Sequence, residues 1–471
     1  MMEMKMTEVG TLLPIWSVIP FIAMLLSIAI FPMIAPGFWT RNYGKISIFW
    51  AFVTSSYIIL KFGNVGLHEI LHMLIGDYIP FIILIGALYI TAGGLFIRGR
   101  FDGTPISNVV MLAVATFLAS LIGTTGASMV LIRPLIRSNK NRRIRAYLIV
   151  IFIFLVSNIG GALTPIGDPP LFLGFLKGVP FFWTLRLIEE MLLMVVPLLL
   201  LFYMVDSYFY KRDKADYLSG SIEVETAIEV LEGEEVSKEK FIKIEGWYNL
   251  ILIFMIVGSV IISGSIKDIG KISILGVERK VVDVVRDIVI VILAIISLKI
   301  TPQEVRKKNE FSWSPIEEVA ILFFGIFVSM VPPIKILQAG EKGALSFIVK
   351  SLREPYHYFW AAGSLSSFLD NAPTYLVFLN SAIGKFYPFI DEKVAVTKLL
   401  LEHPKYLEAI SCGAVFFGSV TYIGNAPNLL TASIAAEYGV KMPSFFGYMF
   451  KYSIPILIPL FTLVTIVFFM S

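Results

Sequence analysis

The chain has 471 residues, of which 57% are apolar and 16% are charged, whereas roughly a quarter of the residues in a soluble globular domain are charged. Its 39 basic and 35 acidic residues leave a formal net charge of only +4, which does not predict a nucleic-acid partner. The composition excludes a soluble enzyme, a disordered chain and, with Cys412 as the single cysteine, a disulfide scaffold.

The apolar residues occur in runs long enough to cross about 30 Å of hydrocarbon. They predict an all-α polytopic membrane protein that lies in the lipid bilayer of the cell inner membrane or plasma membrane. Ten runs predict complete crossings, namely residues 12–34, 46–62, 78–97, 144–176, 181–208, 247–263, 281–298, 315–336, 406–437 and 444–470.

Two further apolar stretches, residues 106–136 and 355–384, have polar, small-residue centres. We expect each to form a re-entrant hairpin, which enters and leaves the membrane on the same face. The basic residues that follow the first hairpin, Arg133 to Arg145, place that side in the cytoplasm. They also predict a cytoplasmic linker loop at residues 211–246.

The chain contains an internal repeat. At an offset of 257 residues, positions 161–170 align with positions 418–427, and five of the ten pairs are identical. We therefore expect an extra N-terminal helix (residues 1–44), a first transport repeat (45–210), a linking helix (247–264) and a second repeat (281–471). Each repeat has a hairpin followed by a broken helix, at residues 144–177 and 406–437.

The linking helix reverses the second copy relative to the first, which gives two inverted-topology repeats. Residues 164–170 read Thr-Pro-Ile-Gly-Asp-Pro-Pro, a segment through which a helix cannot continue. Unwound backbone at membrane depth survives only inside protein or beside a wet cavity. Broken helices at matching positions are typical of secondary transporters that bind substrate between their repeats.

Two acidic residues fall at these interruptions, Asp168 in the first broken helix and Asp370 at the tip of the second hairpin. Asp168 also has the position of a helix N-cap before Pro169, and we expect capping to be one of its roles. An intramembrane acid is costly to bury and indicates a functional site. Either carboxylate could hold a proton or a metal ion in turn, so we expect Na+ at Asp168 and Asp370.

Neutral oxygen ligands that suit a hard monovalent cation surround the same interruptions. Individually, each could instead hold neighbouring helices together. The predicted ion or substrate site comprises Thr124, Thr125, Ser128, Asn158, Thr164, Asp168, Ser366, Ser367, Asp370, Asn371, Thr374, Thr421, Asn425 and Asn428.

One motif points to a different class of protein. His68, Glu69 and His72 match the H-E-x-x-H signature of zinc proteases. We expect no zinc site here, because the segment is interpreted as a short amphipathic stretch before the crossing at 78–97, and the only other histidines are His357 and His403. A membrane zinc protease stays open as an alternative function.

The motifs at residues 157–170, 369–374 and 422–428 resemble the ion transporter superfamily that holds NhaD-type sodium/proton antiporters, ArsB-type arsenite exporters and citrate transporter-like proteins. The resemblance extends from about residue 78 to the C-terminus and is strongest for NhaD-type antiporters. It implies two inverted repeats, a homodimer, an elevator-like motion and no cofactor. Na+ and H+ would then be the transported ions.

The branch of this superfamily depends on two positions. Pro169 and Pro170 stand where NhaD-type proteins typically have hydroxyl residues, which keeps citrate-like substrates open. Asp370 stands at a tip where dicarboxylate carriers have a Ser-Asn-Thr signature, and its charge would repel a bound carboxylate. We expect Na+ or Li+ exchange for H+, with Na+- or H+-coupled carboxylate transport or arsenite-type oxyanion export as the alternatives.

Overall fold

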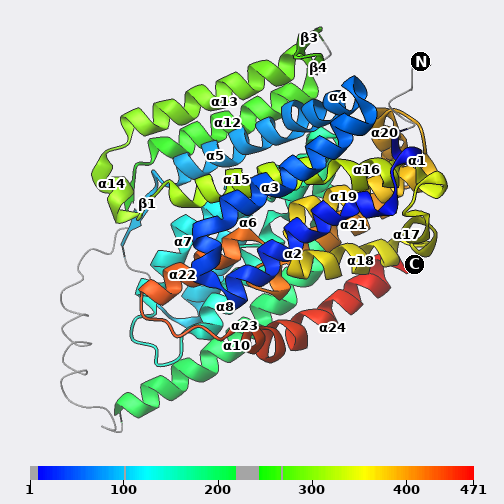
Figure 1. Ribbon diagram of the computed structural model, residues 1–471. Coiled ribbons are helices and arrows are strands. Elements are labelled where there is room, and N and C mark those ends of the chain that lie inside the picture. Colours follow the sequence, from blue (N-terminus) through cyan, green and yellow to red (C-terminus); the bar gives the residue numbers. More distant parts are fainter. Residues whose placement is uncertain (1–8, 100–101, 219–242, 267–268, 471) are drawn as a thin grey trace.

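The computed structural model describes residues 9–99, 102–218, 243–266 and 269–470. Helices dominate these ranges, and the strands within them form two short antiparallel pairs (Figure 1). This arrangement confirms the predicted all-α membrane fold. Residues 219–242 of the predicted linker loop lie outside the described ranges.

The first half of the chain contains helices α1 Val9–Leu12, α2 Ile19–Ile34, α3 Pro36–Phe62, α4 Asn64–His72, α5 Ile79–Ala92, α6 Pro105–Ile122, α7 Thr124–Ser138, α8 Ala146–Leu155, α9 Pro169–Leu176 and α10 Ile188–Leu218. Short 3₁₀ or π turns occupy Ile15–Val18, Met73–Tyr78, Ile159–Leu163 and Phe181–Leu187.

The second half contains α12 Tyr248–Ser265, α13 Val281–Ile300, α14 Gln303–Lys308, α15 Ser314–Ser329, α16 Val331–Gln338, α17 Ser346–Ser351, α18 Pro355–Phe368, α19 Asn371–Phe386, α20 Glu392–Glu402, α21 Pro404–Phe417, α22 Ala426–Glu437, α23 Phe445–Tyr448 and α24 Ile454–Val464. Its short turns are Gly340–Lys342, Gly418–Val420, Met449–Ser453 and Thr465–Phe469. Strand β1 (Phe96–Arg98) pairs with β2 (Lys243–Glu245), and β3 (Lys271–Ile274) pairs with β4 (Val277–Lys280).

Within the described residues, eight helices are long and apolar enough to cross a membrane, or nine if α15 and α16, which meet at a bend of 42°, form one span. This number differs from the ten predicted crossings. The run at 281–298 is helical, but the first two turns of α13 contain the charged residues Asp283, Arg286 and Asp287. The run at 406–437 breaks after the 14 residues of α21. Conversely, α6, which was expected to be one arm of a hairpin, is itself long enough to cross.

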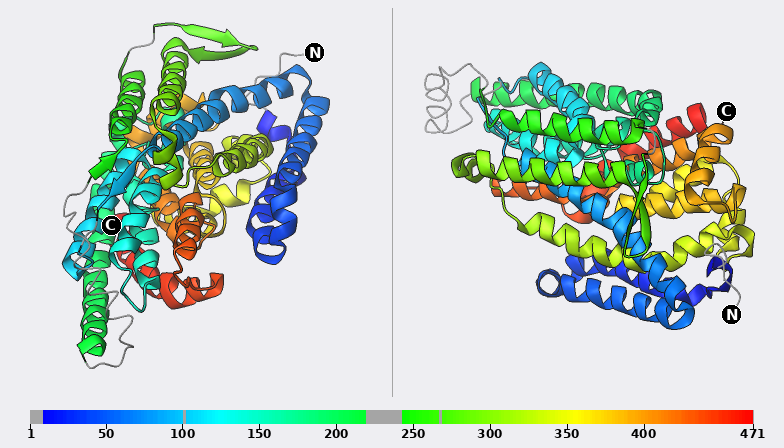
Figure 2. Two further views of the ribbon diagram at one scale, coloured as in Figure 1. Left: turned by 90° about the vertical axis from the view of Figure 1, so that its left-hand side faces the viewer. Right: turned by 90° about the horizontal axis from the view of Figure 1, so that it is seen from above.

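The helices form two packed groups. A helix panel consists of α2, α3, α4, α5, α12, α13 and α15, which pack mainly on one another. Figure 2 shows α2 and α3, in dark blue, as an outer layer of this panel. A hairpin core consists of α6 to α9 and α16 to α22, and α5 is the panel helix that packs against both α7 and α9.

The ends of the molecule differ in the elements they contain. Strand β1 and the basic helix α14 lie at one end in Figure 1, and α1, α17 and α20 lie at the other. We call the first the basic end and the second the opposite end. The rule that basic loops face the cytoplasm predicts that the basic end is cytoplasmic.

Candidate functional site

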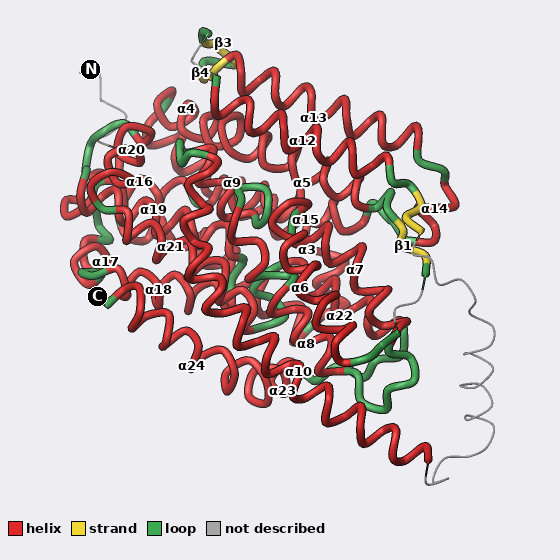
Figure 3. The backbone as a smooth tube through the Cα atoms, turned by 180° about the vertical axis from the view of Figure 1, so that it is seen from behind, coloured by secondary structure: helices red, strands yellow, loops and turns green. Residues whose placement is uncertain are grey.

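Two helices unwind inside the hairpin core, where Figure 3 shows loop segments in the middle of the molecule, away from both ends. After α8 the chain makes one 3₁₀ turn and starts α9 at Pro169. After α21 it makes one 3₁₀ turn and starts α22 at Ala426. The two helix starts are 257 residues apart, which is the offset of the repeat.

Glycines let the backbone cross itself closely at both breaks. A Cβ atom on Gly167 would lie 2.2 Å from the carbonyl oxygen of Gly161, and one on Gly424 would lie 2.6 Å from that of Gly418. The two pairs are 257 residues apart in the sequence. No residue larger than glycine fits there without moving the backbone.

Threonine hydroxyls fasten each unwound segment to the neighbouring hairpin. Thr164 donates to the carbonyl oxygen of Ser120 and accepts from the amide of Gly167 at 3.1 Å. Thr421 donates to the carbonyl oxygen of Ser367 and accepts from the amide of Gly424 at 3.1 Å. Both threonines were predicted as ligands, and in this structure their hydroxyls hold the backbone.

Asp168 is completely buried and receives three side-chain hydrogen bonds. Thr124 Oγ1 and Asn425 Nδ2 donate to its Oδ1 atom at 3.1 and 3.0 Å. Asn371 Nδ2 donates to its Oδ2 atom at 2.6 Å. The first hairpin, the second hairpin and the second broken helix therefore all meet at the carboxylate of the first broken helix.

The expectation that Asp168 caps a helix is wrong for its side chain. Asp168 occupies the N-cap position of α9, but its carboxylate makes no capping hydrogen bond. Pro169 and Pro170 follow it directly and have no N–H to donate, and the next amide, that of Leu171, donates to the backbone carbonyl of Asp168 at 3.1 Å. Asp370 does act as a cap, because its side chain accepts from the amide of Ala372 at 3.1 Å.

A network of polar side chains surrounds the residues that bind Asp168. Asn158 Nδ2 donates to Asn428 Oδ1 at 2.7 Å, and Asn425 Nδ2 approaches Asn158 Oδ1 at 3.3 Å. Asn428 in turn donates to the carbonyl oxygens of Gly418 and Thr421, at 2.7 and 2.9 Å. The amide side chains thus join the two breaks to each other.

This network also includes Ser157 and Thr431, which the sequence patterns did not identify as site residues. The Ser157 hydroxyl lies 2.8 Å from that of Ser128 and 3.2 Å from that of Thr431. Thr431 follows Asn428 by three residues and therefore lies on the same face of α22. That spacing could have identified it.

The remaining predicted ligands are placed differently. Ser366 and Ser367 donate to the backbone carbonyls of Ala414 and Gly363, at 2.6 and 3.0 Å, and Thr374 donates to that of Asp370 at 3.0 Å. Their hydroxyls are directed at the backbone rather than at Asp168. Thr125 instead lines a cavity that Asp370 also lines.

Two cavities that share some of their lining residues approach the site. The smaller, of about 100 Å³, is lined by Gly123, Thr124, Thr125 and Asp370 and by the starts of α9 and α22. The larger, of about 430 Å³, shares Asp370 and Asn425 with it and continues to Arg133, Glu310 and Glu437. Asp370 therefore faces both cavities and makes no hydrogen bond to Asp168 among the contacts of the described residues.

The amide oxygens of Asn371 and Asn425 are notable because, within the described part of the chain, both are buried without a hydrogen-bond donor. Their nitrogen atoms already donate to Asp168. A buried acceptor without a partner is costly. The site thus contains a carboxylate, a hydroxyl and two free amide oxygens, the oxygen ligands that suit a hard cation. Both amides direct their N–H groups at Asp168, so they would have to rotate to offer these oxygens to a cation bound there.

Four helices begin at this site, α7 at Thr124, α9 at Pro169, α19 at Asn371 and α22 at Ala426. Helix N-termini carry partial positive charge. They stabilise the buried carboxylate of Asp168 and the half-buried one of Asp370, and they could equally favour an anionic ligand.

The zinc-protease motif occupies a different environment from the one expected. Residues 68–72 are not a separate amphipathic stretch, because α4, the turn Met73–Tyr78 and α5 form one helix over Asn64–Ala92. Glu69 is buried and pairs with Lys335 at 2.7 Å. Within the ranges the structure describes, no group of three His, Cys, Asp or Glu side chains is arranged to hold a metal ion.

Comparison with known proteins completes this description. A search of curated proteins found no match. Residues 10–469 match a family model described as "Putative citrate transport". The chain therefore belongs to this family of the citrate transporter-like ion transporter superfamily and is a multi-pass secondary transporter.

Proposed function

We propose that the protein exchanges Na+ or Li+ for H+, and that Asp168 binds the cation and the proton in turn. The side chains at the site support this proposal, because Asp168 and Thr124 supply oxygen ligands and the free amide oxygens of Asn371 and Asn425 would complete the set once the two amides rotate. A proton on the Asp168 carboxylate removes the negative charge that attracts the cation. Competition between the two is sufficient for exchange.

The charge of the larger cavity is the observation that carries the choice of a cation. Four acidic side chains line it, those of Glu310, Glu318, Asp370 and Glu437, against the single basic side chain of Arg133. Arg133 is already occupied, since it donates to Glu310 at 2.8 Å. Like charges repel strongly away from bulk water, so this lining attracts cations and opposes a polycarboxylate.

The proposal is tested with purified protein in liposomes that contain a pH-sensitive dye and a preset proton gradient. Addition of NaCl or LiCl is expected to dissipate the gradient with saturable kinetics, and protein-free liposomes serve as the control. If neither salt moves protons while the same preparation accumulates labelled citrate, cation exchange is the wrong function.

Asp370 is proposed as the second carrier of cation and proton. Asp370→Asn is expected to abolish Na+-dependent proton movement, since the side chain faces both cavities. Asp391→Asn is the matched control, because Asp391 caps α20 through the amides of Lys393 and Val394, outside the site. Full activity of Asp370→Asn would remove Asp370 from the mechanism and leave Asp168 as the only carrier.

Cation-coupled citrate transport is the second candidate, and the family match supports it. In this version Asp168 binds the coupling cation, and the helix N-termini at the site favour the substrate carboxylates. Saturable uptake of labelled citrate that requires Na+ would establish it. Uptake that is indifferent to both Na+ and the proton gradient would exclude it.

We also propose that the protein forms a homodimer, as the resemblance to the superfamily implies.

A further inference from the structure

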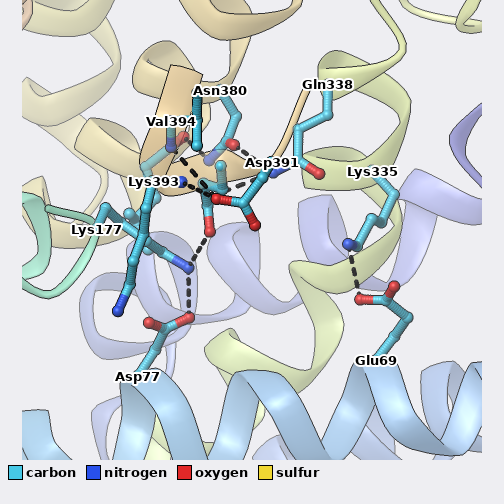
Figure 4. A network of polar contacts seen from close by, with 11 residues as sticks. Glu69, Asp77, Lys177, Lys335, Gln338, Asn380, Asp391, Lys393 and Val394 are labelled. Carbon is cyan, nitrogen blue, oxygen red and sulfur yellow. Dashed lines mark hydrogen bonds and ion pairs between the residues drawn. The ribbon is translucent and has the colours of Figure 1, made fainter. Parts of the chain in front are cut away.

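Lys177 holds two carboxylates at the opposite end of the molecule. Its Nζ atom lies 2.7 Å from Asp77 Oδ2 and 2.8 Å from Glu392 Oε2. The Lys177 side chain is 5% exposed and that of Asp77 is 4% exposed. Figure 4 shows the Lys177 amine directed at Asp77, with the ion pair of Lys335 and Glu69 beside it.

These contacts differ in which helix groups they join. Asp77 lies in the turn between α4 and α5 of the helix panel, whereas Lys177 directly follows α9 of the hairpin core. Glu69 and Lys335 likewise join α4 of the panel to α16 of the core at 2.7 Å. Glu392 begins α20, which packs on α19 and α21. The bond from Lys177 to Glu392 therefore stays within the core, while the other two pairs cross between the groups.

The basic end is built differently. There Arg133 of α7 pairs with Glu310, which precedes α15, at 2.8 Å. The Glu310 side chain is 47% exposed, and the pair lines the larger cavity that leads to Asp370 and Asn425. The panel and core are thus joined at the opposite end by the buried pair of Lys177 and Asp77 and by the pair of Lys335, which is 22% exposed, with Glu69. At the basic end they are joined by a pair whose carboxylate is half exposed.

Lys177 is also rigidly connected to the candidate site. Asp168 precedes the eight-residue helix α9 and Lys177 follows it. A displacement of the Lys177 backbone away from Asp77 would carry Asp168 with it if α9 moves as one body. The ion pair and the site lie at the two ends of one short helix.

We propose that Lys177 and Asp77 form a latch that closes the opposite end, and that this pair must separate before the site can open toward that side. Separation leaves Lys177 paired with Glu392, so the buried ammonium keeps one partner throughout the motion. The inference rests on the secondary-transport function and does not depend on which ion or substrate is carried.

The test measures access to the site without any transport assay. In a Cys412→Ala background, Thr125→Cys places a thiol on the wall of the smaller cavity. A membrane-impermeant maleimide is applied to sealed vesicles of each orientation, and the labelling rate is measured for each face. With the latch intact, labelling should be slow from the opposite end.

Asp77→Asn, which removes the pair between the groups, should raise the labelling rate from the opposite end about tenfold, a modest effect for losing one partner of a buried ion pair. Glu392→Gln is the matched control. It takes a carboxylate from the same ammonium but leaves Asp77 in place, and its labelling rate should equal that of the parent.

The latch would be overturned if Asp77→Asn and the parent were labelled from the opposite end at equal rates. It would also be overturned if Glu392→Gln raised that labelling rate as much as Asp77→Asn does. Monodisperse elution in detergent is required of each variant. If Asp77→Asn does not fold, Glu69→Gln removes the neighbouring pair with Lys335 and should also raise labelling from the opposite end. If the parent protein shows no Na+/H+ exchange while Asp77→Asn still raises the labelling rate, the result speaks against the proposed cation and not against the latch.

Discussion

Asp168→Asn is expected to lower exchange by about two orders of magnitude or more, because an amide carries neither an exchangeable charge nor a titrating proton. The fold should survive the change. The new Nδ2 atom would face Asn371 Nδ2, but the Asn371 amide can rotate and present its oxygen, which has no donor within the described residues. Initial rates in proteoliposomes, at equal amounts of monodisperse protein, measure the effect.

A second buried aspartate, Asp206, provides a control for the general effect of neutralising a buried acidic side chain. Asp206 is completely buried outside the site and accepts from Asn108 at 2.9 Å, from Tyr147 at 2.6 Å and from Arg142 at 3.0 Å. Asp206→Asn weakens the partner of buried Arg142, a kind of change that can cost about 3–5 kcal/mol of stability. Its melting temperature should fall while the exchange rate per folded molecule is retained. The opposite pattern, with Asp168→Asn active and Asp206→Asn inactive, would place the carrier elsewhere.

Gly167→Ala is expected to prevent correct assembly of the site. The new methyl group would lie 2.2 Å from the carbonyl oxygen of Gly161, so backbone must move at the point where the unwound segment crosses itself. Overpacking of a tight interior commonly costs about 1–3 kcal/mol, and a collision between backbone segments should lie at the upper end of that range. The melting temperature and the yield of monodisperse protein measure the loss.

Gly258→Ala is the corresponding control in a helix of the panel. Within the described residues, nothing lies within 4 Å of a Cβ atom at Gly258, and alanine favours a helix over glycine by about 1 kcal/mol. The melting temperature should stay the same or rise slightly. If Gly167→Ala melts like Gly258→Ala, the crossing is less tightly packed than the distances indicate.

The sequence predicted the helical class and the position of the breaks because both depend on local chemistry. Apolar runs report burial in hydrocarbon, and Pro165, Gly167 and Pro169 interrupt any helix. The number of crossings was harder to predict, because α13 is a full helix with charged residues in its first turns. Run length alone does not distinguish a span such as α6 from the arm of a hairpin.

Within the candidate site, Asp168, Asn371 and Asn425 could be found because the repeat marks the breaks and the hairpin tip. The direction of each side chain could not be predicted from the sequence, since it depends on three-dimensional contacts. Thr164 and Thr421 turn toward the hairpin backbone. The pairing of Lys177 with Asp77 joins residues 100 positions apart, a distance over which no local pattern gives a signal.

The two carboxylates of the site have a consequence for its response to voltage. The four helix N-termini stabilise Asp168 and Asp370 locally, but a helix has no net charge, because its C-terminus carries the opposite partial charge. When both carboxylates are ionised the empty carrier therefore has a negative charge at the site, and one bound Na+ or proton reduces it by one unit. Moving one elementary charge through 100 mV is worth about 2.3 kcal/mol. A membrane potential would therefore act more strongly on the empty carrier than on the loaded one.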